Sequence, residues 1–279
     1  MNVITLMMLG TACCYTITSL SDKRAARDGF SPDEFTFLMC LSMSVFLTFT
    51  LPFQSLHFKF GIKSMTGILL TAGCKFLEFN MSVIILRCIS AFELKAWLGI
   101  TLFASYLSDI LLGGEMSLIR LLSLFVIAAG LFMIVRSEKS EPVQYRRIAV
   151  PLVLYLISKF GYGLVIRTFS KYASSTILLL AALLFVAAFT FHKIRPDSYR
   201  ERLRQTAAVV LARIPNTVGM LLENAVIAVS LAQYSLIQPV ILVTLFLISL
   251  LRREQYSGLN ILGSLLCMAG VTVFQLISW

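Results

Sequence analysis

The sequence predicts an all-α integral membrane protein with ten transmembrane helices, arranged as two inverted five-helix repeats. Three observations lead to this prediction. The 279 residues are 58% hydrophobic and only 14% charged, whereas about 25% of the residues in soluble domains are charged. Apolar windows near the length that crosses a bilayer, about 20 residues, recur along the whole chain. Two similar segments also lie half a chain apart. Because the windows are continuously apolar and do not alternate, we expect helices rather than a barrel.

Ten apolar windows are separated by short polar stretches. They cover residues 2–20, 33–53, 65–86, 91–112, 117–135, 148–166, 174–192, 206–228, 231–251 and 257–277. The first window has no basic residue before it and no small-residue cleavage site, and its basic residues come afterwards, so we expect a retained helix rather than a signal peptide. No stretch is left over for a soluble domain.

Composition also excludes some classes of protein. The six cysteines fall within the windows or at their ends and lack metal-ligand spacing, so we expect them to pack as small apolar residues and expect no metal or cofactor. The net charge of +10 is not gathered with aromatic residues on a soluble module, so we expect no nucleic-acid partner. Membrane topology explains the basic residues better.

Basic residues divide unevenly between the two sides of the predicted bundle. Connections 1/2, 3/4, 5/6, 7/8 and 9/10 carry Lys23, Arg24, Arg27, Arg87, Arg136, Lys139, Arg146, Arg147, Lys193, Arg195, Arg200, Arg202, Arg204, Arg252 and Arg253. The opposite side carries Lys59, Lys63, Arg120, Arg167 and Lys171. Lys and Arg favour the cytoplasmic side, so this asymmetry predicts that both termini lie outside.

The ends of the two halves resemble each other. Residues 113–134 read "GGEMSLIRLLSLFVIAAGLFMI" and residues 252–274 read "RREQYSGLNILGSLLCMAGVTVF". Gly130 and Gly270 are 140 positions apart, which is half the chain. We therefore expect repeats at 1–139 and 140–279 that form one membrane domain. Five is odd, so the second repeat enters the membrane from the opposite side.

These features resemble the drug/metabolite transporter superfamily, in particular its EamA-like branch of ten-helix carriers. The motifs are Gly114-Glu115 followed by Gly130, Glu254 followed by Gly263 and Gly270, and "SLIQPV" with Gln238-Pro239. The resemblance covers nearly the whole chain. It implies a carrier of small molecules with a central cavity between the repeats and no cofactor. It also implies cytoplasmic termini, the reverse of what the charge asymmetry predicts, and both orientations stay open.

Two opposite charges lie in the middle of the window 65–86. Lys75 and Glu78 are one helical turn apart and too deep to reach the membrane surface easily. The i, i+3 spacing lets them form an ion pair. The attraction between the two charges lowers the desolvation cost of burying them but rarely removes it. We expect both to face the central cavity, with Glu78 binding a cationic group or a coupling proton and Lys75 tuning Glu78 or holding an anionic group. The alternative is a structural pair that neutralises itself.

Polar stripes mark the first and sixth windows. Tyr155, Lys159 and Tyr162 follow i, i+4, i+7 spacing, and Tyr15 precedes Tyr155 by 140 positions. An aromatic pair across the two-fold relation would suit an amphipathic substrate, with Lys159 as an anion contact. The alternative is ordinary hydrogen bonding between helices.

The eighth window is the most polar of the second half. Arg213, Asn216, Glu223 and Asn224 share about one third of the helix circumference, so we expect that face to look into a cavity, although Arg213 could instead extend to the membrane surface. Pro215 predicts a kink.

Several further residues receive lesser roles. Gln238 is a weaker substrate contact in the ninth window, where Pro239 predicts a second kink. We expect Glu93, Lys95 and Asp109 to be interfacial. Three glycines should allow close helix packing, and two carboxylates should stabilise helix starts. These are Gly130, Gly263 and Gly270, and Glu115 and Glu254.

The predicted function is secondary transport of a small metabolite or drug-like molecule by alternating access, proton-coupled or by exchange. A non-transporting scaffold or an accessory subunit of another carrier is the alternative. We expect no enzyme, because acids and bases are not clustered for catalysis. The expected setting is a multi-pass protein of the plasma (inner) membrane, as a monomer or homodimer, with a small-molecule substrate and the lipid bilayer as its partners.

Overall fold

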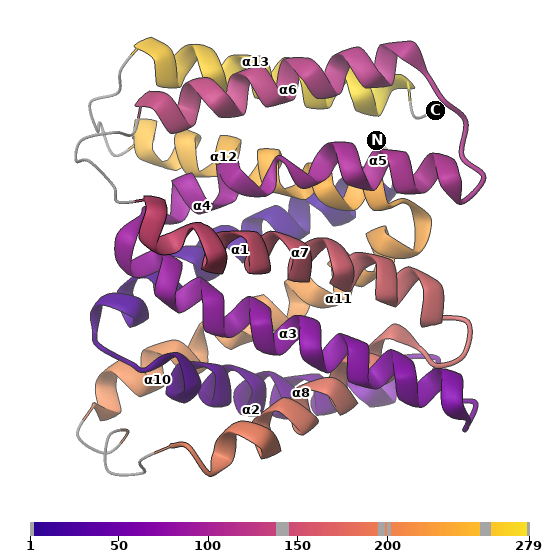
Figure 1. Cartoon of the computed structure of the whole chain (residues 1–279), viewed down its shortest axis with the longest axis vertical. Coiled ribbons are helices and arrows are strands. Elements are labelled where there is room, and N and C mark those ends of the chain that lie inside the picture. The colour runs from indigo at the N-terminus through magenta and orange to yellow at the C-terminus, as the bar shows by residue number, and fades with distance from the viewer. Residues whose placement is uncertain (1–2, 138–144, 195–198, 200–201, 252–257, 278–279) are drawn as a thin grey trace.

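The computed structural model describes residues 3–137, 145–194, 199, 202–251 and 258–277, and these residues are almost entirely helical. The helices are α1 (Val3–Arg27), α2 (Pro32–Thr50), η1 (Leu51–Phe53), α3 (Ile62–Cys88), α4 (Ala91–Leu98), α5 (Thr101–Leu111), α6 (Leu118–Ser137), α7 (Tyr145–Phe169), α8 (Ser175–Phe191), α10 (Leu203–Leu211), α11 (Arg213–Val229), α12 (Leu231–Leu251) and α13 (Gly258–Ile277). They lie roughly along one direction (Figure 1).

Each of the ten predicted windows falls on helix, and two windows are broken. The window 91–112 holds α4 and α5, which meet at Gly99 and Ile100. A Cβ at Gly99 would lie 1.9 Å from Leu131 Cδ1 on α6, so this leucine side chain would have to move aside for any larger residue. The window 206–228 holds α10 and α11, which meet at Ala212.

The two prolines behave differently. Pro215 lies in the first turn of α11, directly after the break, where a missing backbone N–H costs little. Pro239 lies inside α12, which continues through it. The helix is thus broken just before Pro215, where the sequence predicted a kink, and the kink at Pro239 stays a prediction.

Length and composition make the chain a membrane protein. Six helical segments of the described chain could cross a bilayer: Val3–Arg27, Pro32–Phe53, Ile62–Cys88, Glu93–Leu111, Arg146–Phe169 and Gly258–Ile277. Three shorter helical segments are also apolar: Leu118–Ile134, Ser175–Phe191 and Leu231–Leu247. Large apolar side chains such as Phe49, Phe125 and Phe132 are exposed on the outside, as expected for a surface that faces lipid. The all-α membrane class follows.

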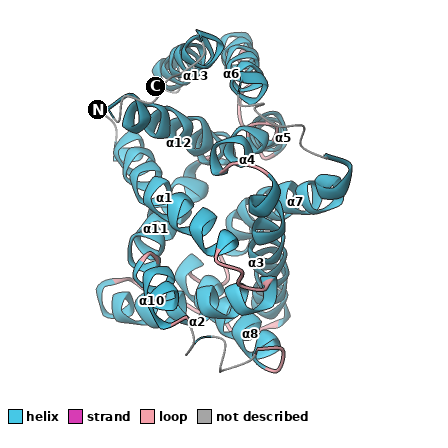
Figure 2. Cartoon of the chain, turned by 90° about the vertical axis from the view of Figure 1, so that its left-hand side faces the viewer, coloured by secondary structure: helices cyan, strands magenta, loops and turns pink. Residues whose placement is uncertain are grey.

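The helices pair across the two halves of the chain. The most extensive contacts are those of α6 with α13, α3 with α7, α1 with α11, α2 with α8, α3 with α8 and α1 with α12, and α5 also packs on α12. Viewed along the helices, α1 and α11 face α3 and α7 across the centre, while α2 and α8 lie on one side and α4, α5 and α12 on the other (Figure 2). The pair α6 and α13 lies outermost. Side chains that α1, α3, α7 and α11 direct inward therefore meet in the middle.

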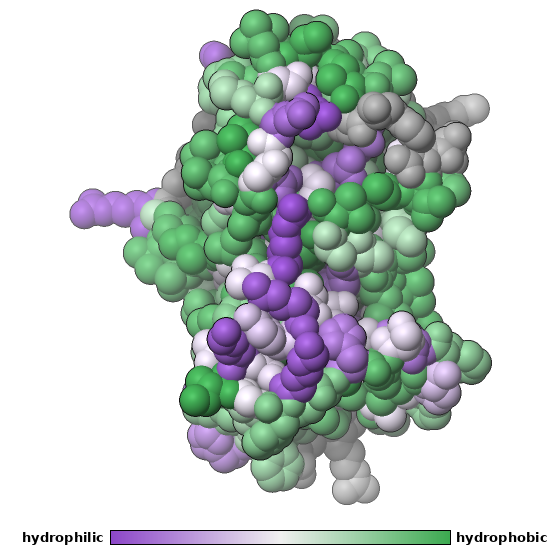
Figure 3. All heavy atoms as spheres, turned by 90° about the vertical axis from the view of Figure 1, so that its right-hand side faces the viewer, coloured by the Kyte–Doolittle hydropathy of each residue, from purple (hydrophilic) through white to green (hydrophobic). Residues whose placement is uncertain are grey.

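The bundle has two distinct ends. The end that holds Val3, Ile277 and the α5–α6, α7–α8 and α11–α12 connections is called the terminus end, and the opposite end is called the basic end. Both chain termini lie on the right of Figure 1. Seen from the terminus end, polar side chains gather in the middle of the face between apolar ones (Figure 3).

Glycines allow α6 and α13 to pack closely, as the sequence predicted. A Cβ at Gly130 would lie 2.6 Å from the carbonyl oxygen of Gly263, and a Cβ at Gly263 would lie 2.7 Å from the carbonyl oxygen of Gly130. A Cβ at Gly270 would lie 3.0 Å from the carbonyl oxygen of Ser123. Backbone atoms cannot move aside as the end of a flexible side chain can, so each of these positions needs glycine.

Substituting Gly130 tests this packing. We expect Gly130→Val to destabilise the protein by about 1–3 kcal/mol, because the added atoms overfill the contact between α6 and α13. Thermal melting of the purified protein in detergent measures the effect. Gly73→Val is the matched control, since a Cβ at Gly73 meets nothing within 4 Å. Equal melting temperatures for the two variants would contradict the close packing.

Candidate functional site

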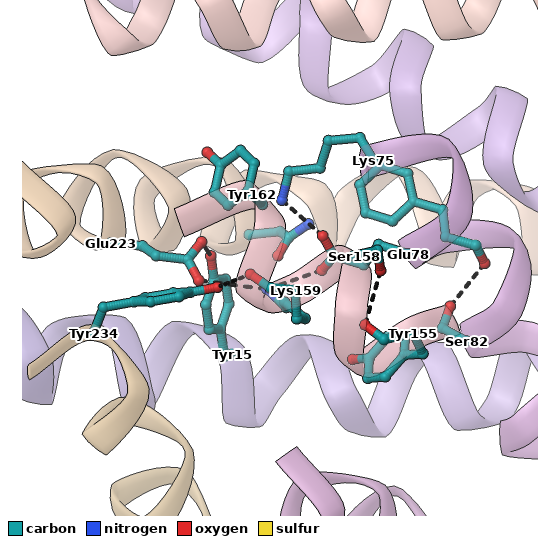
Figure 4. Close-up of polar contacts among 12 residues, drawn as sticks. Tyr15, Lys75, Glu78, Ser82, Tyr155, Ser158, Lys159, Tyr162, Glu223 and Tyr234 are labelled. Atoms are coloured by element: carbon teal, nitrogen blue, oxygen red, sulfur yellow. Dashed lines mark hydrogen bonds and ion pairs between the residues drawn. The ribbon is translucent and has the colours of Figure 1, made fainter. Parts of the chain in front are cut away.

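A chain of alternating charges lies in the centre of the bundle (Figure 4). Lys75 Nζ donates to Glu78 Oε2 at 2.8 Å, and Lys159 Nζ lies 2.9 Å from Glu78 Oε1. Lys159 Nζ also lies 3.4 Å from Glu223 Oε1, and the Tyr15 hydroxyl donates to Glu223 Oε2. All five side chains are buried. The chain links α1, α3, α7 and α11, and therefore both halves of the protein.

The pair on α3 forms as its spacing predicted, but it is not isolated. Each oxygen of Glu78 holds a different lysine, so the charge of Glu78 is already balanced by two cations in this conformation. Lys75 is 0% exposed, and its ammonium lies 3.6 Å from the centre of the Tyr162 ring, a cation–π contact. Tyr162 donates to Asn224 Oδ1 at 2.6 Å. Lys75 is thus enclosed behind Glu78.

A small polar cavity of about 50 Å³ adjoins the charge chain. It is lined by Tyr15, Thr18, Ser19, Asp22, Met39, Glu78, Phe79, Ser82, Lys95, Tyr155, Lys159, Asn216 and Met220. Asp22 lies late in α1, Ser82 lies late in α3, and Asn216 lies early in α11. The cavity therefore extends from the centre towards the basic end.

Five of the ten predicted site residues line this cavity: Tyr15, Glu78, Tyr155, Lys159 and Asn216. Lys75, Tyr162 and Glu223 lie directly behind them, since Lys75 bonds Glu78, Glu223 bonds Lys159, and Tyr162 packs on Lys75. Arg213 and Gln238 are not in the cavity wall. Gln238 is buried in α12, and its Oε1 has no hydrogen-bond partner in the described chain.

Arg213 forms an ion pair, which was not among the expected arrangements. Its guanidinium donates to Asp22 at the end of α1 and to the carbonyl oxygen of Val209 at 3.1 Å. The side chain is fully buried within the protein. Asp22 became available because α1 runs to Arg27 and is longer than the predicted window.

The sequence reasoning placed Lys95 at the membrane interface, and the structure corrects this. Lys95 lies in the wall of the central cavity, and its Nζ lies 5.9 Å from the centre of the Tyr15 ring. No carboxylate of the described chain lies within ion-pair distance of it. The reason is the short helix α4, which starts at Ala91 and carries its second turn towards the centre. The sequence feature that could have indicated this position is a single lysine inside an apolar window.

The charges around the cavity do not balance. Lys75 and Lys159 are matched by Glu78 and Glu223, and the Arg213 charge is matched by Asp22. Lys95 is left over, so the site carries one excess positive charge. A cation in a poorly hydrated cavity attracts an anion more strongly than it would in water.

Tyr234 is a further residue of the site. Its hydroxyl donates to the carbonyl oxygen of Lys159 at 3.0 Å. A Cβ on Gly163 of α7 would lie 2.8 Å from the Tyr234 ring. The first turn of α12 is therefore packed directly against the helix that carries Lys159.

At the terminus end, Asp109 joins three helices. It accepts hydrogen bonds from Ser230 Oγ at 2.6 Å, Leu231 N at 3.0 Å and Ala232 N at 2.9 Å, and it pairs with Arg167 at 2.8 Å. Asp109 thus caps the start of α12 and ties α5 to α7. This cluster lies on the opposite side of the charge chain from the central cavity.

Comparison with known proteins identifies the fold and no more. No family model matches the chain, and no curated protein matches it. Twenty-six chains of solved structures match. One of them, a crystal structure of a protein, covers 98% of this chain over 99% of its own length, with a TM-score of 0.60 and 15% sequence identity. At that identity the likeness shows a shared fold over the whole chain, and membership of the EamA-like branch stays a prediction.

Proposed function

We propose that this protein is a secondary transporter for small organic anions that works by alternating access. The observation that carries the proposal is the central cavity, where the unpaired Lys95 adjoins a buried chain of charges that connects both halves of the bundle. Helices that serve only as scaffold have little reason to bear the cost of inserting so many charges. We further propose that the protein belongs to the EamA-like branch of the drug/metabolite transporters.

Two inverted five-helix repeats are part of this proposal, and the packing of α6 on α13 supports them. Cys267 Sγ donates to the carbonyl oxygen of Ile127, and these residues are 140 positions apart. Adding 140 to the number of Ser123 gives Gly263, and subtracting 140 from that of Gly270 gives Gly130. The contact between Ser123 and Gly270 therefore corresponds to the contact between Gly263 and Gly130. A two-fold axis between Ile127 and Cys267 would relate them.

The pairing of the other helices follows the same rule. In this two-fold relation α1 corresponds to α7, and α3 corresponds to the pair α10 and α11. The contact between α1 and α11 is then equivalent to the contact between α3 and α7. Ten membrane crossings would also use all ten apolar windows, with α4 and α5 forming one crossing and α10 and α11 another. Five crossings in each half then invert the second half.

The excess charge of Lys95 indicates the class of substrate. A singly charged anion would balance the site, while the rings of Tyr15 and Tyr155 would contact its carbon part. The cavity volume of about 50 Å³ holds one or two water molecules, each of which occupies about 30 Å³. The conformation described is therefore narrowed around the site, and substrate entry requires helices to move apart.

The two ends of the path differ in this conformation. The cavity extends towards the basic end, while Asp109 and Arg167 hold α5, α7 and α12 together at the terminus end. The positive-inside rule would place the basic end in the cytoplasm and both termini outside. In that orientation, the conformation is the one closed to the outside. We propose that the alternate state breaks the Asp109 cluster and closes the basic end.

A proteoliposome assay tests the function. Benzenesulfonate, a permanent anion, should exchange across vesicles that contain the purified protein, and phenyltrimethylammonium, a permanent cation, should not. Lys95→Gln should slow anion exchange about 10- to 100-fold, because a hydrogen bond to a charged group is worth about 1.5–3 kcal/mol. Lys63→Gln, at an exposed lysine of the terminus end, is the control. Cation exchange, or anion exchange unaffected by Lys95→Gln, would contradict the proposal.

A further inference from the structure

A second polar cavity of about 180 Å³ lies at the terminus end and is larger than the central one. Its wall includes Tyr106, Arg120, Arg167, Gln233 and Phe274. These side chains come from α5, α6, α7, α12 and α13. The cavity is thus built between helices of both halves, at the end of the bundle where polar side chains gather in Figure 3.

The cavity contains a cation that has no counter-ion among the described residues. Arg120 donates one hydrogen bond to the carbonyl oxygen of Ile277 at 3.0 Å, its Nε is buried without a partner, and it forms no ion pair in the described chain. Arg167, in contrast, is matched by Asp109. Glu115 also lines the cavity but is exposed and lies beyond ion-pair distance of Arg120, and it does not cap α6 as predicted. Arg120 lies in the first turn of α6, where the helix dipole adds to its positive charge.

The oxygen of a buried amide is also left without a partner among the described residues. Gln233 is 8% exposed, and its Oε1 forms no hydrogen bond with any described residue. Buried polar groups in native proteins are nearly always hydrogen-bonded, and the exceptions often mark a position filled by water or ligand. Gln233 lies in the same cavity wall as Arg120. Two polar groups on different helices therefore lack partners at one site.

The first turn of α12 separates the two cavities. Gln233 lines the cavity at the terminus end, while the next residue, Tyr234, donates to the carbonyl oxygen of Lys159 in the central charge chain. Asp109 holds this turn by its cap. The first turn of α12 therefore contacts both the second cavity and the helix that carries Lys159.

We propose that the second cavity is a binding site for the acid group of a small organic anion. Arg120 receives the charged oxygens, Gln233 Oε1 accepts a hydrogen bond from an N–H or O–H group of the ligand, and the Tyr106 and Phe274 rings, with centres 6.1 Å apart, contact its carbon part. The place of this site on a transport path rests on the proposed function. Binding itself does not, because it depends only on the cavity.

Equilibrium binding of radiolabelled benzenesulfonate to the purified full chain in neutral detergent tests the site. We expect two binding sites per chain in the wild type, one in Arg120→Gln and one in Lys95→Gln. Gln233→Leu should leave benzenesulfonate binding nearly unchanged, because this anion has no donor for Gln233 Oε1, and should weaken binding of 4-hydroxybenzenesulfonate about tenfold or more. Arg120→Lys should retain part of the binding of both anions. Arg136→Gln is the matched control, because Arg136 is exposed at the other end of the same helix.

Two results would overturn the proposal. One is a number of benzenesulfonate sites per chain that is the same in Arg120→Gln as in the wild type. The other is a single site in wild-type protein that becomes two only when bound phosphatidylglycerol is removed, because the cavity would then hold a lipid headgroup. Two-site binding without any flux in proteoliposomes would contradict transport and leave the second site standing. Flux in proteoliposomes together with a single binding site per chain would support transport and contradict the second site.

Discussion

Replacing Lys159 with methionine should destabilise the protein by about 3–5 kcal/mol, the cost of breaking a buried ion pair by removing one partner. Lys159 lies 2.9 Å from Glu78 and 3.4 Å from Glu223. Without it, Glu78 keeps only Lys75, and Glu223 keeps only the Tyr15 hydroxyl. A buried carboxylate without a cation is then left in the middle of the bundle, and thermal melting of the purified protein should fall accordingly.

A second substitution separates loss of charge balance from loss of packing. The double variant Lys159→Met with Glu223→Gln removes the uncompensated carboxylate, so it should recover much of the lost stability. Lys171→Met, at an exposed lysine after α7, should melt like the wild type. If Lys159→Met also melts like the wild type, or if adding Glu223→Gln lowers stability further, the charge balance of the central chain does not stabilise the protein.

Replacing Glu78 should affect both stability and transport. Glu78→Gln is nearly isosteric, but it leaves Lys75 buried without a carboxylate, since Glu78 is the only acid in ion-pair contact with Lys75 in the described chain. The charge-balanced variant Lys75→Met with Glu78→Gln avoids this cost. It should fold and yet lose at least about tenfold in anion exchange, because Glu78 is the carboxylate of the chain that lines the cavity and links α3 to Lys159 on α7.

Much of the fold could be predicted from the sequence, because a bilayer imposes a strong pattern on a chain. Each helix must satisfy its own backbone, so apolar windows predict helices well. The i, i+3 spacing of Lys75 and Glu78 fixed their pairing, since residues one turn apart on a helix are neighbours. The match between the two halves predicted that Gly130 and Gly270 allow close packing.

Contacts between helices were beyond the sequence, because a helix periodicity does not say which partner each face meets. Nothing in the sequence showed that Lys159 would join Glu78 to Glu223, or that Asp22 would neutralise Arg213. Lys95 was misplaced because its distance from the start of the window suggested a surface position, whereas the short α4 brings it to the cavity.

Asp109 and Glu115 lie near helix ends as predicted, but their contacts differ from those expected. Asp109 does lie at a helix end as expected, but it caps α12 rather than meeting water alone. Glu115 lies three residues before the start of α6 at Leu118, near a helix start as expected, but it forms no capping hydrogen bond with a described residue. The corresponding prediction for Glu254 lies outside the described residues.

The most direct test of transport through the central site is benzenesulfonate counterflow in proteoliposomes, measured for the wild type and for Lys75→Met with Glu78→Gln. Asp33→Asn, which alters a surface ion pair with Lys193, is the control. The melting temperature of each protein is measured in the same preparation. We predict counterflow in the wild type and the control, and its loss in the double variant at a nearly unchanged melting temperature. Wild-type counterflow in the double variant, or none in the wild type, would contradict transport through this site.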